Sequence, residues 1–324
     1  MAALTAAWRP ITHLPSHPRS SHTLSILQSS LHLFSGSLPS AAAYSAELYI
    51  LPLSPAIPIA ITVLASPLSP PPRISAASTV LDGTLYVFGG HGGSDTNPLV
   101  EGGRVWSFAA GGHEWTPLDP SDENAPFPEA RSGHAMAAAG GKIYVHSGSL
   151  QDLWCFDVRD RRWERLADAP GDPKSGMGIA ITGGRELWRF GGWERAVDVF
   201  DISNGTWRSI SYTHGPPARS GSGLFPIRFA RTGTEYLVTL FGERDPSADG
   251  PGVLFDDVWA YNIANAEWSE VTISSTMKPN PRGQFAAVAV GSPDGGSNGR
   301  GVVVQGGLDE DNWTLEDWWL LEFN

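Results

Sequence analysis

The sequence is poor in cysteine, in basic residues and in uninterrupted apolar runs. The only cysteine, Cys155, excludes an internal disulfide bond and fits a reducing compartment. Lysine and arginine number 22 against 34 acidic residues, and the formal net charge of -12 argues against nucleic acid or an anionic membrane as a partner. The N-terminus has no charged segment followed by an unbroken apolar core, so we expect no signal peptide.

The most apolar window, residues 51–68, is interrupted by four prolines, at positions 52, 55, 58 and 67. Proline breaks a helix because it lacks the N–H and clashes with the preceding turn, so a membrane helix is not expected here. The sequence therefore predicts a soluble and cytoplasmic protein that does not bind membranes.

Turn-forming residues and tryptophan are abundant, with 37 glycines, 26 prolines and 13 tryptophans. Such a composition predicts many short strands and many turns. One short β-type run that ends at small residues, Leu85–Gly90, has counterparts spaced roughly 45–60 residues apart, which indicates a repeat. The counterparts are Leu31–Gly36, Lys142–Gly148, Glu186–Gly192, Tyr236–Gly242 and Val302–Gly307.

A fixed interval to a tryptophan marks the second half of four repeats. A strand with a pair of residues two positions apart is followed by a tryptophan nine positions after the first member of the pair. The pairs and their tryptophans are Trp106/Phe108 with Trp115, Trp154/Phe156 with Trp163, Asp198/Phe200 with Trp207, and Trp259/Tyr261 with Trp268. This regularity predicts a two-strand hairpin of constant geometry.

The glycine pair, the aromatic position and the spaced tryptophan together resemble the kelch repeat, one four-stranded blade of a β-propeller. The resemblance covers nearly the whole chain and implies an all-β, six-bladed propeller in a single domain, residues 1–324. The sixth repeat ends after its third strand, and we expect the N-terminal strand with Trp8 to close it, because an open sheet edge favours aggregation. The expected blades span roughly 14–68, 69–118, 126–166, 170–210, 214–272, and 278–324 with 4–13.

A basic residue precedes the first strand of every repeat, and the chain direction places all of these residues at one mouth of the central channel. They are Arg19, Arg73, Arg131, Lys174, Arg219 and Arg282. Two interpretations stay open: each arginine holds neighbouring blades together, or a subset binds an oxygen-rich or anionic ligand. For the second, we take Arg73 and Arg131 as catalytic and the other four as substrate-binding.

The loop Leu240–Gly252 resembles the corresponding loop of nitrile-specifier and thiocyanate-forming proteins, plant kelch propellers that direct the breakdown of an unstable small molecule. The resemblance implies an iron site built from Glu, Asp and His. Glu243 with Asp245 or Asp249 supplies carboxylates, but Pro251 stands where the histidine is expected. We therefore expect no metal and no cofactor, and assign Glu243 as catalytic; the alternative is that Glu243 pairs with an arginine of the mouth.

Three further residues of the variable loops are candidate ligand contacts. Trp193 and Trp313 are not required by the repeat and offer stacking surfaces for an apolar ligand, and His91 joins them as a substrate-binding candidate. Cys155 lies beside core aromatics and is interpreted as packing. The sequence contains no Ser-His-Asp, P-loop or zinc-ligand pattern.

We therefore predict a small-molecule-binding propeller of secondary metabolism that steers a reactive, largely apolar intermediate at the channel mouth. Elimination, rearrangement or cyclisation needs shape and hydrogen bonds rather than a covalent nucleophile, so lyase, isomerase or cyclase activity fits. The alternative is a non-catalytic kelch scaffold that binds a protein partner. A mouth pocket of a few hundred cubic ångströms, lined by the two loop tryptophans and the arginines, would favour the first prediction.

Overall fold

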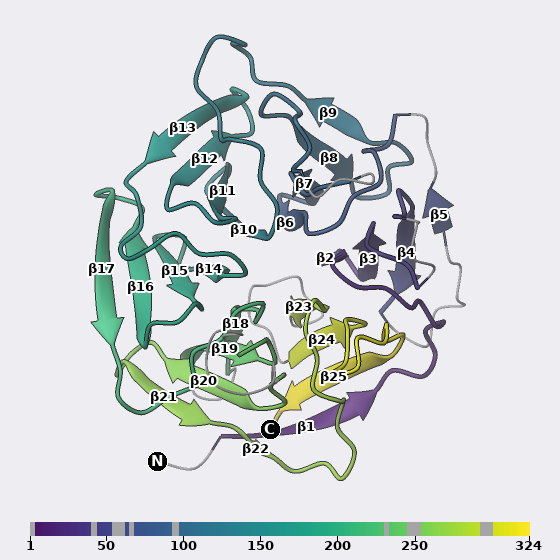
Figure 1. Ribbon diagram of the computed structural model, residues 1–324, viewed down its shortest axis with the longest axis vertical. Helices are drawn as coiled ribbons and strands as arrows, with labels where there is room; N and C mark the ends of the chain where they lie inside the picture. The colour runs from purple at the N-terminus through teal and green to yellow at the C-terminus, as the bar shows by residue number, and fades with distance from the viewer. Residues whose placement is uncertain are drawn as a thin grey trace.

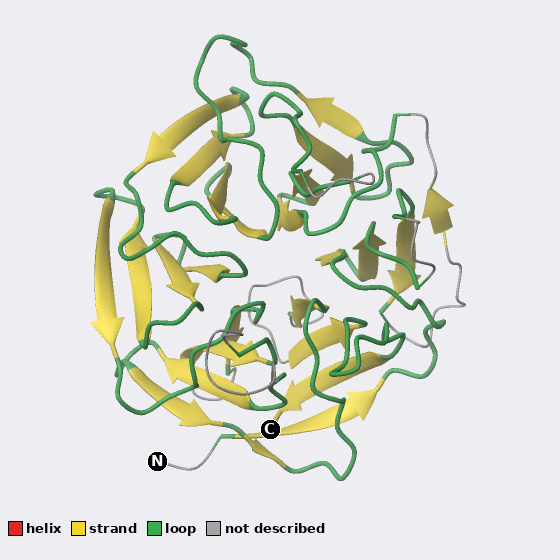
Figure 2. Cartoon of the chain, viewed as in Figure 1, coloured by secondary structure: helices red, strands yellow, loops and turns green. Residues whose placement is uncertain are grey.

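The computed structural model describes residues 4–39, 44–53, 62–64, 68–92, 97–229, 233–244, 254–291 and 301–324. Six sheets of short strands are arranged around a central axis, as the repeats predicted (Figure 1). Strands and loops make up the described residues (Figure 2). Within these ranges no helix is long and apolar enough to cross a membrane.

In the first five sheets the strands follow the chain order from the axis outwards, and we number the sheets as blades 1 to 5. Blade 1 contains β2 (Thr23–Leu27), β3 (Ser30–Phe34), β4 (Leu48–Pro52) and β5 (Thr62–Leu64); blade 2 contains β6 (Ala77–Leu81), β7 (Thr84–Phe88), β8 (Val105–Ala109) and β9 (Thr116–Leu118); blade 3 contains β10 (His134–Ala139), β11 (Lys142–Ser147), β12 (Leu153–Asp157) and β13 (Arg162–Leu166); blade 4 contains β14 (Gly178–Thr182), β15 (Glu186–Phe190), β16 (Ala196–Asp201) and β17 (Thr206–Ser211); blade 5 contains β18 (Phe225–Arg228), β19 (Glu235–Leu240), β20 (Val258–Asn262) and β21 (Glu267–Glu270).

Blade 6 combines the two ends of the chain. It contains β23 (Ala286–Val290), β24 (Gly301–Gln305), β25 (Trp318–Phe323) and β1 (Thr5–Pro10), with β22 (Thr272–Ile273) added in parallel beyond β1. Strand β1 pairs antiparallel with β25, in a register that places Ala6 opposite Phe323. The N-terminal strand therefore closes the last blade, which confirms the sequence prediction and leaves β25 without an exposed edge.

The repeat tryptophans connect adjacent blades. Trp163 packs against Phe156 of its own hairpin, with ring centroids 4.9 Å apart, and against Phe88 of blade 2 at 5.2 Å. Its indole N–H also donates to the carbonyl of Gly103 in blade 2, at 2.7 Å. The fixed interval of the sequence thus sets the position of a side chain that docks each hairpin on the preceding blade. Truncating such a buried aromatic to alanine typically costs about 3–5 kcal/mol.

Candidate functional site

A ring of backbone hydrogen bonds surrounds the axis where the chain enters the innermost strands. The ring is formed by the residue two positions after each basic residue, and all six have positive φ: Ser21 (53°), Ser75 (53°), Gly133 (62°), Gly176 (67°), Gly221 (64°) and Gln284 (51°). The N–H groups of the first five donate to the carbonyl of the ring residue in the preceding blade, at 2.8–3.0 Å. We call these six residues the inner ring. It fixes the blades relative to one another at this face.

A cavity of about 630 Å³ lies inside the inner ring and the first residues of the innermost strands. Small and apolar side chains such as Ala77, Met136 and Ile179 contribute to its wall, together with serine hydroxyls. The volume falls within the range of sites that enclose small molecules. We call it the axial cavity. Among the described residues that line it, Glu243 is the only one with a formally charged side chain.

Glu243 follows Gly242, three residues beyond the end of β19, and its backbone exchanges two hydrogen bonds with Ser220, at 2.8 and 2.9 Å. Its carboxyl group lies against Gly283 of blade 6, so close that a Cβ added to this glycine would lie 2.3 Å from Oε1. No residue that the structure describes forms a hydrogen bond or ion pair with this carboxylate. Burial raises its pKa. The cavity is therefore bordered by a carboxyl group that has no partner among the described residues and is easier to protonate than usual.

His91 occupies the equivalent position in blade 2, directly after Gly90. Its backbone exchanges hydrogen bonds with Ile74 at 2.8 and 3.0 Å, as that of Glu243 does with Ser220. Blades 2 and 5 lie opposite each other in the ring of six sheets (Figure 1). Two residues chosen from the sequence, His91 and Glu243, thus border one cavity from opposite sides.

Two further histidines, which were not predicted as site residues, line the axial cavity. His22 and His134 each lie three positions after a basic residue, and neither ring has a hydrogen-bond partner in the described part of the chain. Burial, assisted by the charge of Arg131, lowers the pKa of His134 to about 3. Burial and Arg19 lower the pKa of His22 well below its usual value. Both rings therefore stay neutral near pH 7.

The arginines of the mouth are buried and engaged within the blades. Arg73 donates two hydrogen bonds to the carboxylate of Glu101, at 2.8 and 2.9 Å. It donates two more to the carbonyls of Gly89 and Pro71, at 2.9 and 3.1 Å. The same pattern joins Arg131 to Asp152, Arg219 to Asp257 and Arg282 to Asp317. These side-chain partners lie in the arginine's own blade, not in the neighbouring blade as the structural alternative expected. None of these arginines is among the residues that line the axial cavity.

The remaining mouth candidates also lie outside the lining of the cavity. Arg19 donates to the carbonyl of Ser35 and lies over the ring of Tyr49, and Lys174 forms an ion pair with Glu194 at 2.7 Å. Trp193 and Trp313 are 44% and 72% exposed. The axial cavity therefore differs from the expected mouth pocket, because its described lining contains neither the loop tryptophans nor the basic residues.

The iron site implied by the loop resemblance is represented by one residue here. Asp245, Asp249 and Pro251 lie outside the described residues, which leaves Glu243. Across the described ranges, no group of three or more His, Cys, Asp or Glu side chains is placed to hold a metal ion. The described residues thus supply one carboxylate of that ligand set, and we derive no chemical step through a metal.

Cys155 is buried in β12, between core aromatics. Burial raises the pKa of its thiol to about 12, so the nucleophilic thiolate is scarce at neutral pH. The residue packs the core, as the sequence indicated.

These features define a kelch-type β-propeller with a ligand-sized cavity on its axis. The family model of the KLHDC2/KLHL20/DRC7 Kelch-repeats domain matches residues 4–192, more than half of the chain. The chain belongs to this family of kelch-repeat proteins.

Relatives of this chain include an enzyme and proteins named for the fold. It is 26% identical to the N-(sulfonatooxy)prop-2-enimidothioate sulfolyase of Thlaspi arvense, over 90% of this chain and 88% of that protein. It is 30% identical to human Kelch domain-containing protein 10, over 31% of this chain and 23% of that protein. The solved structure of YjhT has a TM-score of 0.71 at 18% identity and covers 97% of this chain and 100% of YjhT, a likeness of fold.

Proposed function

We propose that the protein binds a small molecule in the axial cavity and steers a reactive, largely apolar intermediate through elimination, rearrangement or cyclisation. The observation that carries the proposal is a cavity of about 630 Å³ bordered by the unpaired carboxyl group of Glu243. A relative that aligns along 90% of this chain and is named as a sulfolyase supports a lyase-type reaction.

Glu243 is the residue to which we assign proton transfer. A carboxyl group acts best as a general acid or base when its pKa lies near the working pH, and burial shifts the pKa of Glu243 in that direction. In an elimination, the carboxylate removes a proton from carbon. The electron pair of the C–H bond forms the new double bond, and the leaving group departs with its own bonding pair.

The remaining lining supplies contacts that bind the ligand. Side chains such as Met136 and Ile179 surround an apolar body, and the hydroxyl group of Ser75 offers a hydrogen bond at the inner ring. In this proposal Arg73 holds the loops of blade 2 in place, because four of its five N–H donors are already used within the blade.

An interaction scaffold is the second candidate. Trp313 is 72% exposed and Trp193 is 44% exposed, both in loops that follow the glycines of their blades, and exposed tryptophans are common anchors of protein interfaces. The likeness to Kelch domain-containing protein 10 is compatible with such a role.

The two candidate functions are distinguished by incubating wild type and two variants with a small-molecule extract of the source cells. Compounds that each protein binds or consumes are then measured. Wild type is expected to retain and consume a compound that mass spectrometry identifies. Glu243→Gln should consume this compound about a hundredfold more slowly or worse, because proton transfer is lost. Ala135→Trp, which fills the cavity from β10, should retain none. If wild type neither retains nor consumes any compound, the small-molecule proposal is wrong.

A further inference from the structure

In the described lining of the axial cavity, a negatively charged side chain is present and a positively charged lysine or arginine is not. The basic residues of the mouth are bound to carboxylates or carbonyls of the blades, and the histidines His22 and His134 are held neutral. In the described lining, the formal charge that faces the cavity is the carboxylate of Glu243. An anionic ligand would lie beside this carboxylate with no compensating cation among the described lining residues, which makes its burial costly.

Two aromatic rings border the same sector of the cavity as Glu243. Phe225 begins β18, and its ring lies over Gly223, where an added Cβ would meet Cζ at 2.1 Å. Phe285 lies two residues after Gly283, the glycine that the Glu243 carboxyl group contacts, and packs edge-on against Phe241 with ring centroids 5.3 Å apart. Both rings are half-buried and line the cavity.

We propose that the axial cavity selects an organic cation, whose alkyl- or arylammonium group binds at the junction of blades 5 and 6 between Glu243 and the rings of Phe225 and Phe285. A carboxylate satisfies the charge, and aromatic faces attract quaternary and protonated amines through their quadrupoles. The apolar part of the ligand then extends along the axis between the innermost strands. This inference rests on the proposed function and names the ligand class of the same site.

The ligand proposed for this chain differs in charge from the substrate named for its sulfolyase relative. The name of that enzyme describes a sulfonatooxy substrate, which is an anion. The cavity described here offers a lone carboxylate where an anion would need a cation. A shared fold with a changed charge in the cavity is the expected result when one propeller scaffold serves different ligands.

The dependence on pH follows from the same contact. Burial raises the pKa of Glu243 in the free protein, and a bound ammonium group favours the ionised carboxylate. Cation binding therefore releases a proton where Glu243 is protonated, and the affinity increases with pH until the carboxylate is fully ionised.

Calorimetry with three probes tests the proposal: benzyltrimethylammonium, its neutral isostere with carbon in place of nitrogen, and benzenesulfonate. We expect the cation to bind about tenfold or more tightly than the neutral isostere, and the anion to bind least. Glu243→Gln should weaken binding of the cation about tenfold and leave the neutral isostere unaffected. The control Glu123→Gln removes the same charge from an exposed loop and should change neither.

Phe285→Leu provides a second test, because it keeps an apolar side chain and removes the aromatic face. We expect weaker binding of the cation and unchanged binding of the neutral isostere. Equal binding of cation and isostere to wild type, or no binding of the cation, overturns the proposal. Failure of the proposed function is detected separately, when wild type retains no compound from the cell extract.

Discussion

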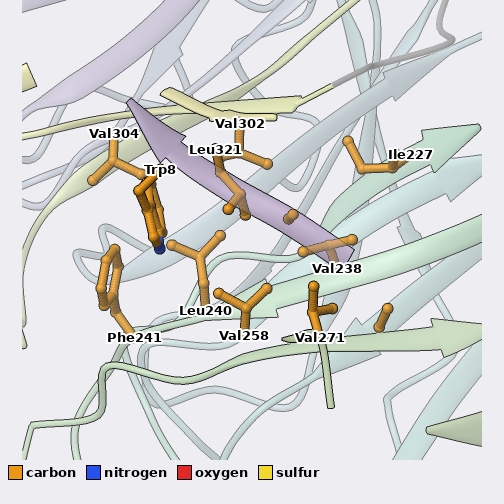
Figure 3. Packing of buried hydrophobic residues seen from close by; sticks show 12 residues of the cluster. Trp8, Ile227, Val238, Leu240, Phe241, Val258, Val271, Val302, Val304 and Leu321 are labelled. Carbon is orange, nitrogen blue, oxygen red and sulfur yellow. The ribbon is translucent and has the colours of Figure 1, made fainter. Parts of the chain in front are cut away.

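Trp8 from the first strand of the chain stacks on Phe241 of blade 5, with ring centroids 5.6 Å apart and ring planes 24° from parallel (Figure 3). Leu321 of β25 and Val304 of β24 belong to the same buried cluster. The N-terminal strand therefore does more than complete blade 6. It also joins that blade to its neighbour, so the two ends of the chain are held in one core.

Removing this strand should destabilise the whole propeller. Trp8→Ala is expected to lower the free energy of unfolding by about 3–5 kcal/mol, because a buried indole and its stacking partner lose contact. Deletion of residues 1–10 should expose the edge of β25 and cause aggregation and loss of cooperative unfolding. Denaturant titration and light scattering measure both effects.

Trp313→Ala is the matched control, since this tryptophan is 72% exposed and its loss should change stability by less than about 0.5 kcal/mol. A deletion variant that stays monomeric with an unchanged melting temperature would contradict closure by the N-terminal strand.

The paired arginines should be needed for stability. Arg73→Gln leaves the carboxylate of Glu101 without its bidentate partner, and loss of one member of a buried ion pair typically costs about 3–5 kcal/mol. Arg131→Gln should behave in the same way through Asp152. The exposed Arg159→Gln is the control. If Arg73→Gln melts normally but loses ligand binding, the ligand-contact interpretation holds instead.

Stability should fall as the pH is lowered from about 6.5 towards 3, in part because of His134. Its pKa is about 3 in the folded protein and near 6.5 when unfolded, so the unfolded chain binds an extra proton within this window. Protonation therefore favours unfolding. His134→Gln should make the fall in stability less steep in denaturant titrations at a series of pH values. The exposed His113→Gln should leave the slope as in wild type, and an equal slope for His134→Gln would refute a buried neutral imidazole.

Gly283→Ala should weaken ligand binding without unfolding the protein. The added methyl group would lie 2.3 Å from Oε1 of Glu243, and this flexible carboxyl group can move aside. Calorimetry with benzyltrimethylammonium should show the loss, while the melting temperature stays close to that of wild type. Because the effect acts through Glu243, adding Gly283→Ala to Glu243→Gln should cause little further loss. Additive losses would show that Gly283 acts by another route.

The fold was predictable from the sequence because its determinants are periodic. Glycine pairs and a tryptophan at a fixed interval recur in the chain, and the missing last strand could be found at the N-terminus by its tryptophan, Trp8. The same interval also places a contact between blades, since Trp163 docks its hairpin on the preceding blade through Gly103.

The partners of the arginines were harder to predict, because the separation in sequence varies. Arg73 and Glu101 are 28 residues apart, whereas Arg131 and Asp152 are 21 apart. A signal was nevertheless present: Asp152, Asp257 and Asp317 each lie two residues before a tryptophan whose indole N–H donates to that carboxylate. The same short motif in three repeats indicates a structural carboxylate.

The lining of the cavity was only partly predictable. Glu243 could be found because its loop resembles that of nitrile-specifier and thiocyanate-forming proteins, and His91 because it lies in a variable loop. His22 and His134 share a spacing of three residues from a basic residue, but their contribution to the cavity depends on the burial that six converging strands create. Such convergence is a property of the closed ring and cannot be read from one repeat.

The central claim is that the axial cavity is a small-molecule site that uses Glu243. The most direct measurement is a crystal structure of Glu243→Gln with the compound that wild type consumes from the cell extract. We predict electron density for this compound inside the inner ring, in contact with the side chain at position 243. Density at the exposed Trp313 with an empty axial cavity would contradict the account.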